Sequence, residues 1–163
     1  MLKAILFDLD GDIVEAKNIH FQALNSALPE KYNISWKDHL SIYDGLKTNQ
    51  KLEILTKRKG LSADLYPDIW KSKQENTIKE LDKLEKNESI IELFSFLKSK
   101  NIIIGVCSNS IRKTIVTVLS KFEIMEMVDY FISNENVQNS KPHPEMYWNA
   151  MIKFGLNPEE VLI

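Results

Sequence analysis

The apolar and polar positions divide the chain into three segments of different character. Residues 3–7 are a short apolar run that predicts a buried strand, because acidic residues and Gly11 end it abruptly. From 16 to 85 the apolar positions recur at helical spacing, and no stretch is typical of a strand. From 86 to 163 predicted helices and strands alternate, which indicates a parallel α/β sheet.

The middle segment contains three predicted helices, each with recognisable end signals. The first stops before Pro29, which cannot continue a helix. The second begins at Thr48, which we expect to be its N-cap, and closes at Gly60. The third follows Ser62. Because this block is too long for one crossover connection, we interpret 16–85 as an inserted helical cap domain.

The last segment supplies the rest of the predicted sheet. Its elements in chain order are a helix at 88–99, a strand within 101–110, a helix at 111–122, a strand at 130–133, a helix at 144–154 and a final strand in 159–163. We therefore predict an α/β fold with a Rossmann-like parallel core, formed by 1–15 and 86–163 and incomplete at its last strand. The α-helical cap, 16–85, is inserted into that core.

Composition narrows the class of protein without indicating an activity. The 163 residues are 44% hydrophobic and 27% charged, which is typical of a soluble globular protein. A net charge of −2 predicts no nucleic-acid or membrane partner, and no apolar stretch is long enough to span a bilayer. The single cysteine excludes an internal disulfide and favours a cytoplasmic location. Dispersed glycines and histidines predict neither a glycine-rich phosphate loop nor a zinc site.

Polar side chains follow three predicted strands, at the ends where parallel sheets bind ligands. Asp8 and Asp10 follow the first strand, Ser108 and Asn109 follow the second, and Lys141 lies beyond the third. Two neighbouring carboxylates repel each other, and Mg²⁺, which prefers oxygen ligands, would relieve that repulsion. One carboxylate is then suited to attack phosphorus and the other to protonate a leaving alkoxide. The serine, amide and ammonium groups are suitable donors to phosphoryl oxygens, so these residues predict a phosphoryl-transfer site.

The same residues lie in stretches that resemble the motifs of the haloacid dehalogenase superfamily. The three stretches are FDLDG at 7–11, VCSNS at 106–110 and SKPHPEMY at 140–147. The resemblance implies that Asp8 is the nucleophile and Asp10 the general acid/base, with both contributing to a Mg²⁺ site. It also implies that Ser108 and Lys141 bind phosphate, and that the helical segment is a small cap that closes over the substrate.

The second aspartate distinguishes the reactions of this superfamily, because a leaving alkoxide needs a proton whereas a halide does not. Asp10 therefore favours hydrolysis of a small phosphate monoester, such as a sugar phosphate, through an aspartyl-phosphate intermediate. The predicted partner is a small phosphorylated metabolite. A phosphomutase of the β-phosphoglucomutase type is the alternative, since a sequence does not show whether the acyl-phosphate is shielded from water.

The resemblance extends into the predicted cap, where substrate selection is expected. His20 falls shortly after the first motif, and related sugar-phosphate mutases and phosphatases carry a histidine there. An ordinary position on a helix surface is the alternative interpretation of His20. The stretch YDGLKTNQKL at 43–52 resembles a substrate-recognition loop, in which Gly45, Thr48 and Lys51 are the candidate contacts.

Two features depart from the family pattern. Asp12 stands where relatives have a small or apolar residue, and its charge would repel a phosphate unless the side chain is turned away or metal-bound. Relatives continue into a fourth, acidic motif that completes Mg²⁺ coordination, whereas this chain ends at Ile163. We therefore expect weakened Mg²⁺ binding and keep a third alternative, a catalytically impaired protein that binds a phosphate ligand. The unfinished sheet exposes an edge, so a monomer or a weak dimer is expected.

Overall fold

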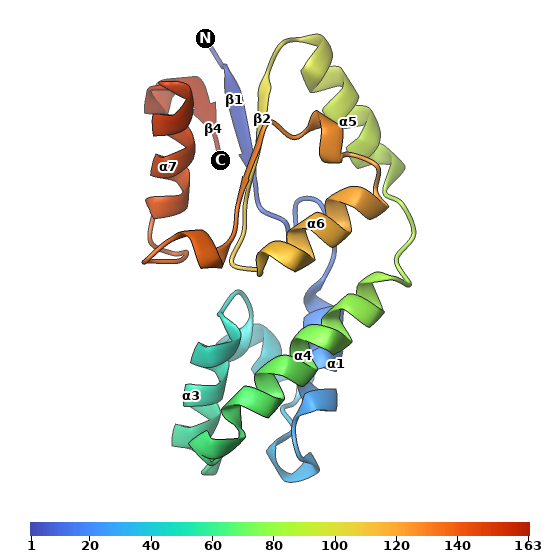
Figure 1. Ribbon diagram of the computed structural model, residues 1–163, viewed down its shortest axis with the longest axis vertical. Helices are drawn as coiled ribbons and strands as arrows, with labels where there is room; N and C mark the ends of the chain where they lie inside the picture. The colour runs from blue at the N-terminus through green and yellow to red at the C-terminus, as the bar shows by residue number, and fades with distance from the viewer. The chain divides into compact units, whose positions relative to one another are not determined.

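The computed structural model describes residues 1–163, which divide into two compact units (Figure 1). One unit comprises Met1–Glu15 and Glu85–Ile163, and the other comprises Ala16–Leu84. We refer to them as the sheet unit and the helical unit. The chain therefore leaves the sheet unit after its first strand and returns to it after about 70 residues, an excursion far longer than an ordinary crossover.

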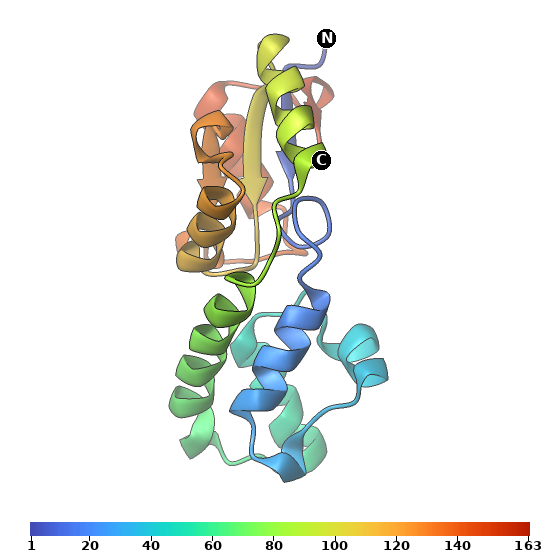
Figure 2. The same ribbon diagram turned by 90° about the vertical axis from the view of Figure 1, so that its right-hand side faces the viewer.

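The sheet unit is built on four parallel strands in the order β3-β2-β1-β4. They are β1 (Ala4–Phe7), β2 (Ile103–Cys107), β3 (Tyr130–Ile132) and β4 (Val161–Leu162). The helices are α5 (Glu88–Ser99), α6 (Arg112–Lys121) and α7 (Glu145–Phe154), with short 3-10 turns η4 (Met125–Met127), η5 (Asn134–Asn136) and η6 (Pro158–Glu160). Figure 2 shows α5 and α6 on one face of the sheet and α7 on the other. The predicted α/β fold is confirmed, and all four strands end at the same edge of the sheet.

Both faces of the central strands are buried, which explains their continuous apolar sequences. On the face toward α7, Leu6, Cys107 and Ile132 of the strands form a buried cluster with Met146 and Ala150 of that helix. On the opposite face, the ring of Phe7 lies 5.0 Å from that of Phe94 in α5. Gly105 of β2 packs directly against Leu6, because a Cβ atom at Gly105 would meet the Leu6 side chain.

The helical unit has its own hydrophobic core. Its elements are α1 (Lys17–Ala27), η1 (Glu30–Tyr32), α2 (Trp36–Asp38), the π-helical turn η2 (His39–Tyr43), α3 (Thr48–Lys59), η3 (Ala63–Leu65) and α4 (Tyr66–Leu81). Leu24, Leu52 and Leu55 are completely buried in this core. The helices are thus held together by their apolar faces, as the spacing of the apolar residues predicts.

Most helix ends follow their sequence signals. Gly60 and Gly155 adopt left-handed conformations after α3 and α7, with φ of 72° and 61°. The expectation that Thr48 is the N-cap of α3 is wrong, because Thr48 is already the first helical residue and Lys47 takes the N-cap position. The Thr48 hydroxyl instead accepts a hydrogen bond of 3.2 Å from the amide of Gln74. None of the helices combines the length and apolarity that a membrane span requires.

Candidate active site

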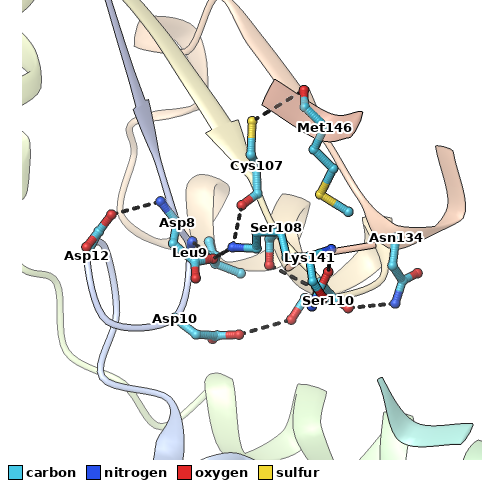
Figure 3. Close-up of polar contacts among 11 residues, drawn as sticks. Asp8, Leu9, Asp10, Asp12, Cys107, Ser108, Ser110, Asn134, Lys141 and Met146 are labelled. Atoms are coloured by element: carbon cyan, nitrogen blue, oxygen red, sulfur yellow. Dashed lines mark hydrogen bonds and ion pairs between the residues drawn. The ribbon is translucent and has the colours of Figure 1, made fainter. Parts of the chain in front are cut away.

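The loop after β1 is held by its own hydrogen bonds (Figure 3). The backbone N–H of Asp8 donates to Asp12 Oδ2 at 2.8 Å, and that of Leu9 donates to Asp8 Oδ1 at 2.7 Å. Gly11, with a φ of +119° that glycine adopts most readily, donates its N–H to the carbonyl of Val14 at 2.9 Å. The Asp12 carboxylate is thus turned back onto the main chain of Asp8, where it fixes the loop.

Lys141 lies beside the first aspartate. Its ammonium Nζ is 2.7 Å from Asp8 Oδ1 and donates to the carbonyl oxygen of Cys107 at 2.9 Å. The side chain of Asn109 accepts from the Lys141 N–H and donates to the Lys141 carbonyl, both at 3.0 Å. The Asn134 amide in turn donates to the Asn109 carbonyl at 2.6 Å. Asn109 therefore holds the main chain of Lys141 directly, and Asn134 holds Asn109. These bonds position the Lys141 ammonium beside Asp8.

Two serines follow β2, and the second of them, Ser110, contacts the loop after β1. Ser108 is completely buried, and its Oγ accepts a hydrogen bond of 3.0 Å from the backbone N–H of Ser110. Because that bond uses Ser108 Oγ as an acceptor, its hydroxyl proton is left to donate elsewhere. The Ser110 hydroxyl donates to Asp10 Oδ2 at 3.3 Å. The structure thus brings the predicted Asp8, Asp10, Ser108, Asn109 and Lys141 together at the carboxyl ends of β1 and β2.

Burial and charge oppose each other at this site. Burial raises the pKa of Asp8 above its ordinary value, and the charge and hydrogen bond of Lys141 counteract that rise. Burial also raises the pKa of Cys107 to about 12, so its thiol is a poor nucleophile. The pKa of Tyr147 is raised to about 12 by burial, with the Asp8 charge adding to the effect. Lys141 is therefore the group that favours the ionised form of Asp8.

The remaining predicted residues belong to the helical unit. His20 in α1 and Thr48 and Lys51 in α3 are buried. Gly45 is exposed in the turn before α3, where its φ of +71° is sufficient reason for a glycine. A role of these four residues in substrate binding stays a prediction.

Sequence reasoning missed part of the site. Ser110 lies within the second motif, but the motif indicates no role for it. Asn134 follows β3 with no distinguishing pattern around it, so only the structure connects it to Asn109. The sequence allows the Asp12 carboxylate to turn away from a phosphate, but it does not predict that this carboxylate accepts the hydrogen bond of the Asp8 backbone N–H.

Paired aspartates, a serine and a lysine thus lie at the strand ends of a Rossmann-like parallel sheet. The chain belongs to the haloacid dehalogenase-like hydrolase family, which it matches over residues 5–163. It is thus a member of an enzyme family.

Individual relatives are distant in sequence and similar in fold. The chain is 23% identical over 164 residues to a phosphorylated carbohydrates phosphatase of Thermotoga maritima, covering 99% of this chain and 75% of the relative. A crystal structure of β-phosphoglucomutase from Clostridium difficile is 25% identical, with a TM-score of 0.85 over 99% of this chain and 74% of that one. CbbY from Rhodobacter sphaeroides, solved with xylulose-(1,5)bisphosphate, has a TM-score of 0.87 at 19% identity, covering 99% of this chain and 76% of that one, and this likeness concerns the fold alone.

Proposed function

We propose that this protein hydrolyses a small phosphate monoester, and that phosphorylated sugars are its substrate class. The observation that carries the proposal is the contact between Asp8 and Lys141 beside the buried Ser108, with Asp10 on the same loop. A carboxylate held against an ammonium, next to a hydroxyl donor, suits nucleophilic attack on a phosphoryl group. The name of the Thermotoga relative supports the sugar-phosphate class.

The proposed reaction has two displacements at phosphorus. In the first, a carboxylate oxygen of Asp8 bonds to phosphorus while the bond from phosphorus to the alkoxide breaks, and Asp10 gives its proton to that alkoxide. In the second, Asp10 takes a proton from water, the hydroxide attacks phosphorus, and the Asp8 carboxylate leaves. Ser108 and Lys141 donate hydrogen bonds to the phosphoryl oxygens in both steps. The products are an alcohol and inorganic phosphate.

Mg²⁺ is the cofactor that we propose for this site. No group of three or more histidine, cysteine, aspartate or glutamate side chains that could hold a metal converges in the chain. The carboxylate of Asp8 and the main-chain carbonyl of Asp10 nevertheless fit Mg²⁺, which often takes one or two carboxylates and completes its shell with water and phosphate. When bound, Mg²⁺ would offset the repulsion between the carboxylates and the phosphate.

The helical unit is proposed to select the leaving group. Gly45, Thr48 and Lys51 are candidates because their stretch, 43–52, resembles a substrate-recognition loop. His20 is a candidate because related sugar-phosphate mutases and phosphatases carry a histidine at this place after the first motif. Lys51→Gln is expected to raise KM for sugar phosphates and to leave turnover of an aryl phosphate nearly unchanged. An equal loss for both substrates would contradict a role of Lys51 in selection.

Turnover tests the proposal. Phosphate release would be measured from a panel of sugar phosphates and an aryl phosphate, with and without Mg²⁺. Asp8→Asn is expected to abolish release from every substrate. Asp10→Asn should slow sugar phosphates far more than the aryl phosphate, whose leaving group needs little protonation. Asp68→Asn, an exposed aspartate in the helical unit, is the matched control and should leave activity unchanged. Full activity of Asp8→Asn would refute the proposal.

A phosphomutase is the second candidate, favoured by the 0.85 TM-score to β-phosphoglucomutase. It would move the phosphoryl group between two hydroxyls of one sugar, with no phosphate released. Monitoring sugar phosphate isomers by ³¹P NMR in the same assays separates the two reactions. If no substrate turns over and vanadate binds, the chain is the impaired phosphate binder.

A further inference from the structure

A groove lies along the free edge of the sheet, away from the residues of the candidate active site. It has a volume of about 470 Å³ and runs beside β3, the strand at the end of the sheet order. Its lining residues come from β3, the start of α6, η5 and α7: Arg112, Tyr130, Phe131, Ile132, Asn136, Asn149, Ile152 and Lys153. An edge strand offers backbone groups to an added strand, so this groove combines a pairing edge with side chains on both sides.

Two cations flank this edge on opposite faces of the sheet. The guanidinium of Arg112 lies 4.5 Å above the ring of Phe131, and Lys153 Nζ lies 5.5 Å from the centre of the Tyr130 ring. Consecutive strand residues point to opposite faces, and Tyr130 packs with the cluster that faces α7. Arg112 therefore stands on the α6 side of the edge and Lys153 on the α7 side.

Aromatic rings, rather than carboxylates, hold these cations. The nearby carboxylate of Glu135 accepts a hydrogen bond of 2.6 Å from the backbone N–H of Arg112 and forms no ion pair with its guanidinium. The groove lining contains two cations and two carboxamides, Asn136 and Asn149, and no acidic residue. A ring contact leaves the N–H groups at the guanidinium edge directed outward, where an oxygen acceptor can reach them.

We propose that the β3 edge binds an extended acidic segment of a partner polypeptide. The segment adds as a strand beside β3 and places two consecutive acidic side chains on opposite faces of the sheet. One acid pairs with Arg112 and the next with Lys153, because successive side chains of an added strand alternate as those of β3 do. The three residues of β3 span ~10 Å, so the recognised core is short.

Charge disfavours a second copy of this chain as the occupant of the edge. Pairing of two copies through their β3 edges would bring the Arg112 and Lys153 side chains of both chains together. Like charges that face each other across strands are destabilising. An acidic partner instead neutralises both cations, and the groove favours it over a second copy.

The test uses the full chain and a synthetic probe, acetyl-Thr-Val-Glu-Glu-Val-Thr-amide, titrated by two-dimensional amide NMR. Chemical-shift changes are expected at the backbone of β3 and at the start of α6, and they should weaken as salt rises. The matched peptide with Gln-Gln in place of Glu-Glu is expected to bind at least about tenfold more weakly. Arg112→Gln with Lys153→Gln should reduce binding of the acidic peptide to the level of the Gln-Gln peptide. Lys113→Gln, an exposed neighbour outside the groove, is the control and should bind normally.

Several results would overturn the proposal. These are equal binding of the two peptides, shift changes confined to other parts of the chain, and no binding at millimolar peptide. Full displacement by equimolar inorganic phosphate would show a small-anion site instead. Dimer formation by sedimentation that is abolished in the double variant would show that a second copy occupies the edge. Melting temperatures of the variants establish that each is folded. Because the readout is peptide binding, the test does not depend on whether the protein releases phosphate.

Discussion

Removal of the Lys141 ammonium should move the acid limb of the pH–rate profile and slow the reaction. In the proposed reaction Asp8 must be ionised to attack phosphorus. Burial raises the pKa of Asp8, and the charge and hydrogen bond of Lys141 oppose that rise. In Lys141→Gln the opposing contribution is lost, so the pKa of Asp8 rises further and more of the enzyme carries a protonated, inactive Asp8. The acid limb is therefore expected at higher pH than in the wild type.

The size of the rate effect follows from the contacts of Lys141. Its ammonium is 2.7 Å from Asp8 Oδ1, and because the Lys141 side chain is 15% exposed and that of Asp8 is 38% exposed, water screens the interaction in part. A hydrogen bond to a charged group contributes ~1.5–3 kcal/mol, and each 1.4 kcal/mol corresponds to about tenfold in rate. Loss of one donor to a phosphoryl group in such a site reduces kcat by ~10²-fold or more. We expect a reduction of about 10²-fold in kcat/KM at the optimum pH.

The assay is phosphate release from the best substrate of the panel, measured across pH for the wild type and Lys141→Gln. Lys98→Gln is a matched control, because Lys98 makes an ion pair of the same 2.7 Å with Asp129 in the same unit. Lys141→Arg, which keeps the charge, should retain the position of the acid limb better than Lys141→Gln. An unchanged acid limb in Lys141→Gln, with the protein folded, would refute the assigned role of Lys141.

Three further predictions concern single residues of the sheet unit. The thiol of Cys107, with a pKa of about 12 and complete burial, should react with a disulfide reagent only after unfolding, and fast labelling of the native protein would contradict its placement. Backbone hydrogen bonds from Gln138 and Asn139 lower the pKa of Glu145 below its ordinary 4.5, so its ionised form stabilises the fold above that pH and the contribution is lost as the pH falls through the lowered value. Glu145→Gln should therefore melt below the wild type at neutral pH, with the gap closing in acid, and a constant gap would argue against this. Gly105→Ala brings a Cβ against Leu6 and should reduce the free energy of unfolding by ~1–3 kcal/mol in denaturant titrations, whereas an unchanged midpoint would mean that the contact is loose.

The sequence predicted most of the sheet unit because its signals are local and strong. The continuous apolar run of β2 and the helix at 88–99 are specified by neighbouring residues, and the structure has that helix at Glu88–Ser99. The candidate site residues of this unit are also predictable from local signals. They follow directly after strands, and the ends of parallel strands meet at one edge of a sheet.

Other features depend on contacts between residues distant in the chain, and no local pattern encodes them. The sequence predicts Asn109 as a phosphate donor, yet both polar atoms of its side chain bond to the main chain of Lys141, 32 positions later. The π-helical turn at His39–Tyr43 carries no sequence signal that separates it from an ordinary helix. Its His39 ring stacks on Trp36 and lies near Phe21, which is a tertiary arrangement.

Covalent trapping of the aspartyl phosphate tests the proposed nucleophile most directly. The protein would be quenched during turnover of an aryl phosphate with Mg²⁺ and treated with borohydride, which reduces an aspartyl phosphate to homoserine. Peptide mass spectrometry then locates the modified position, with Asp8→Asn as the blank. Modification is expected at Asp8 and at no other acid. Turnover with Asp8 unmodified, or modification at Asp10 or Asp12, would contradict it.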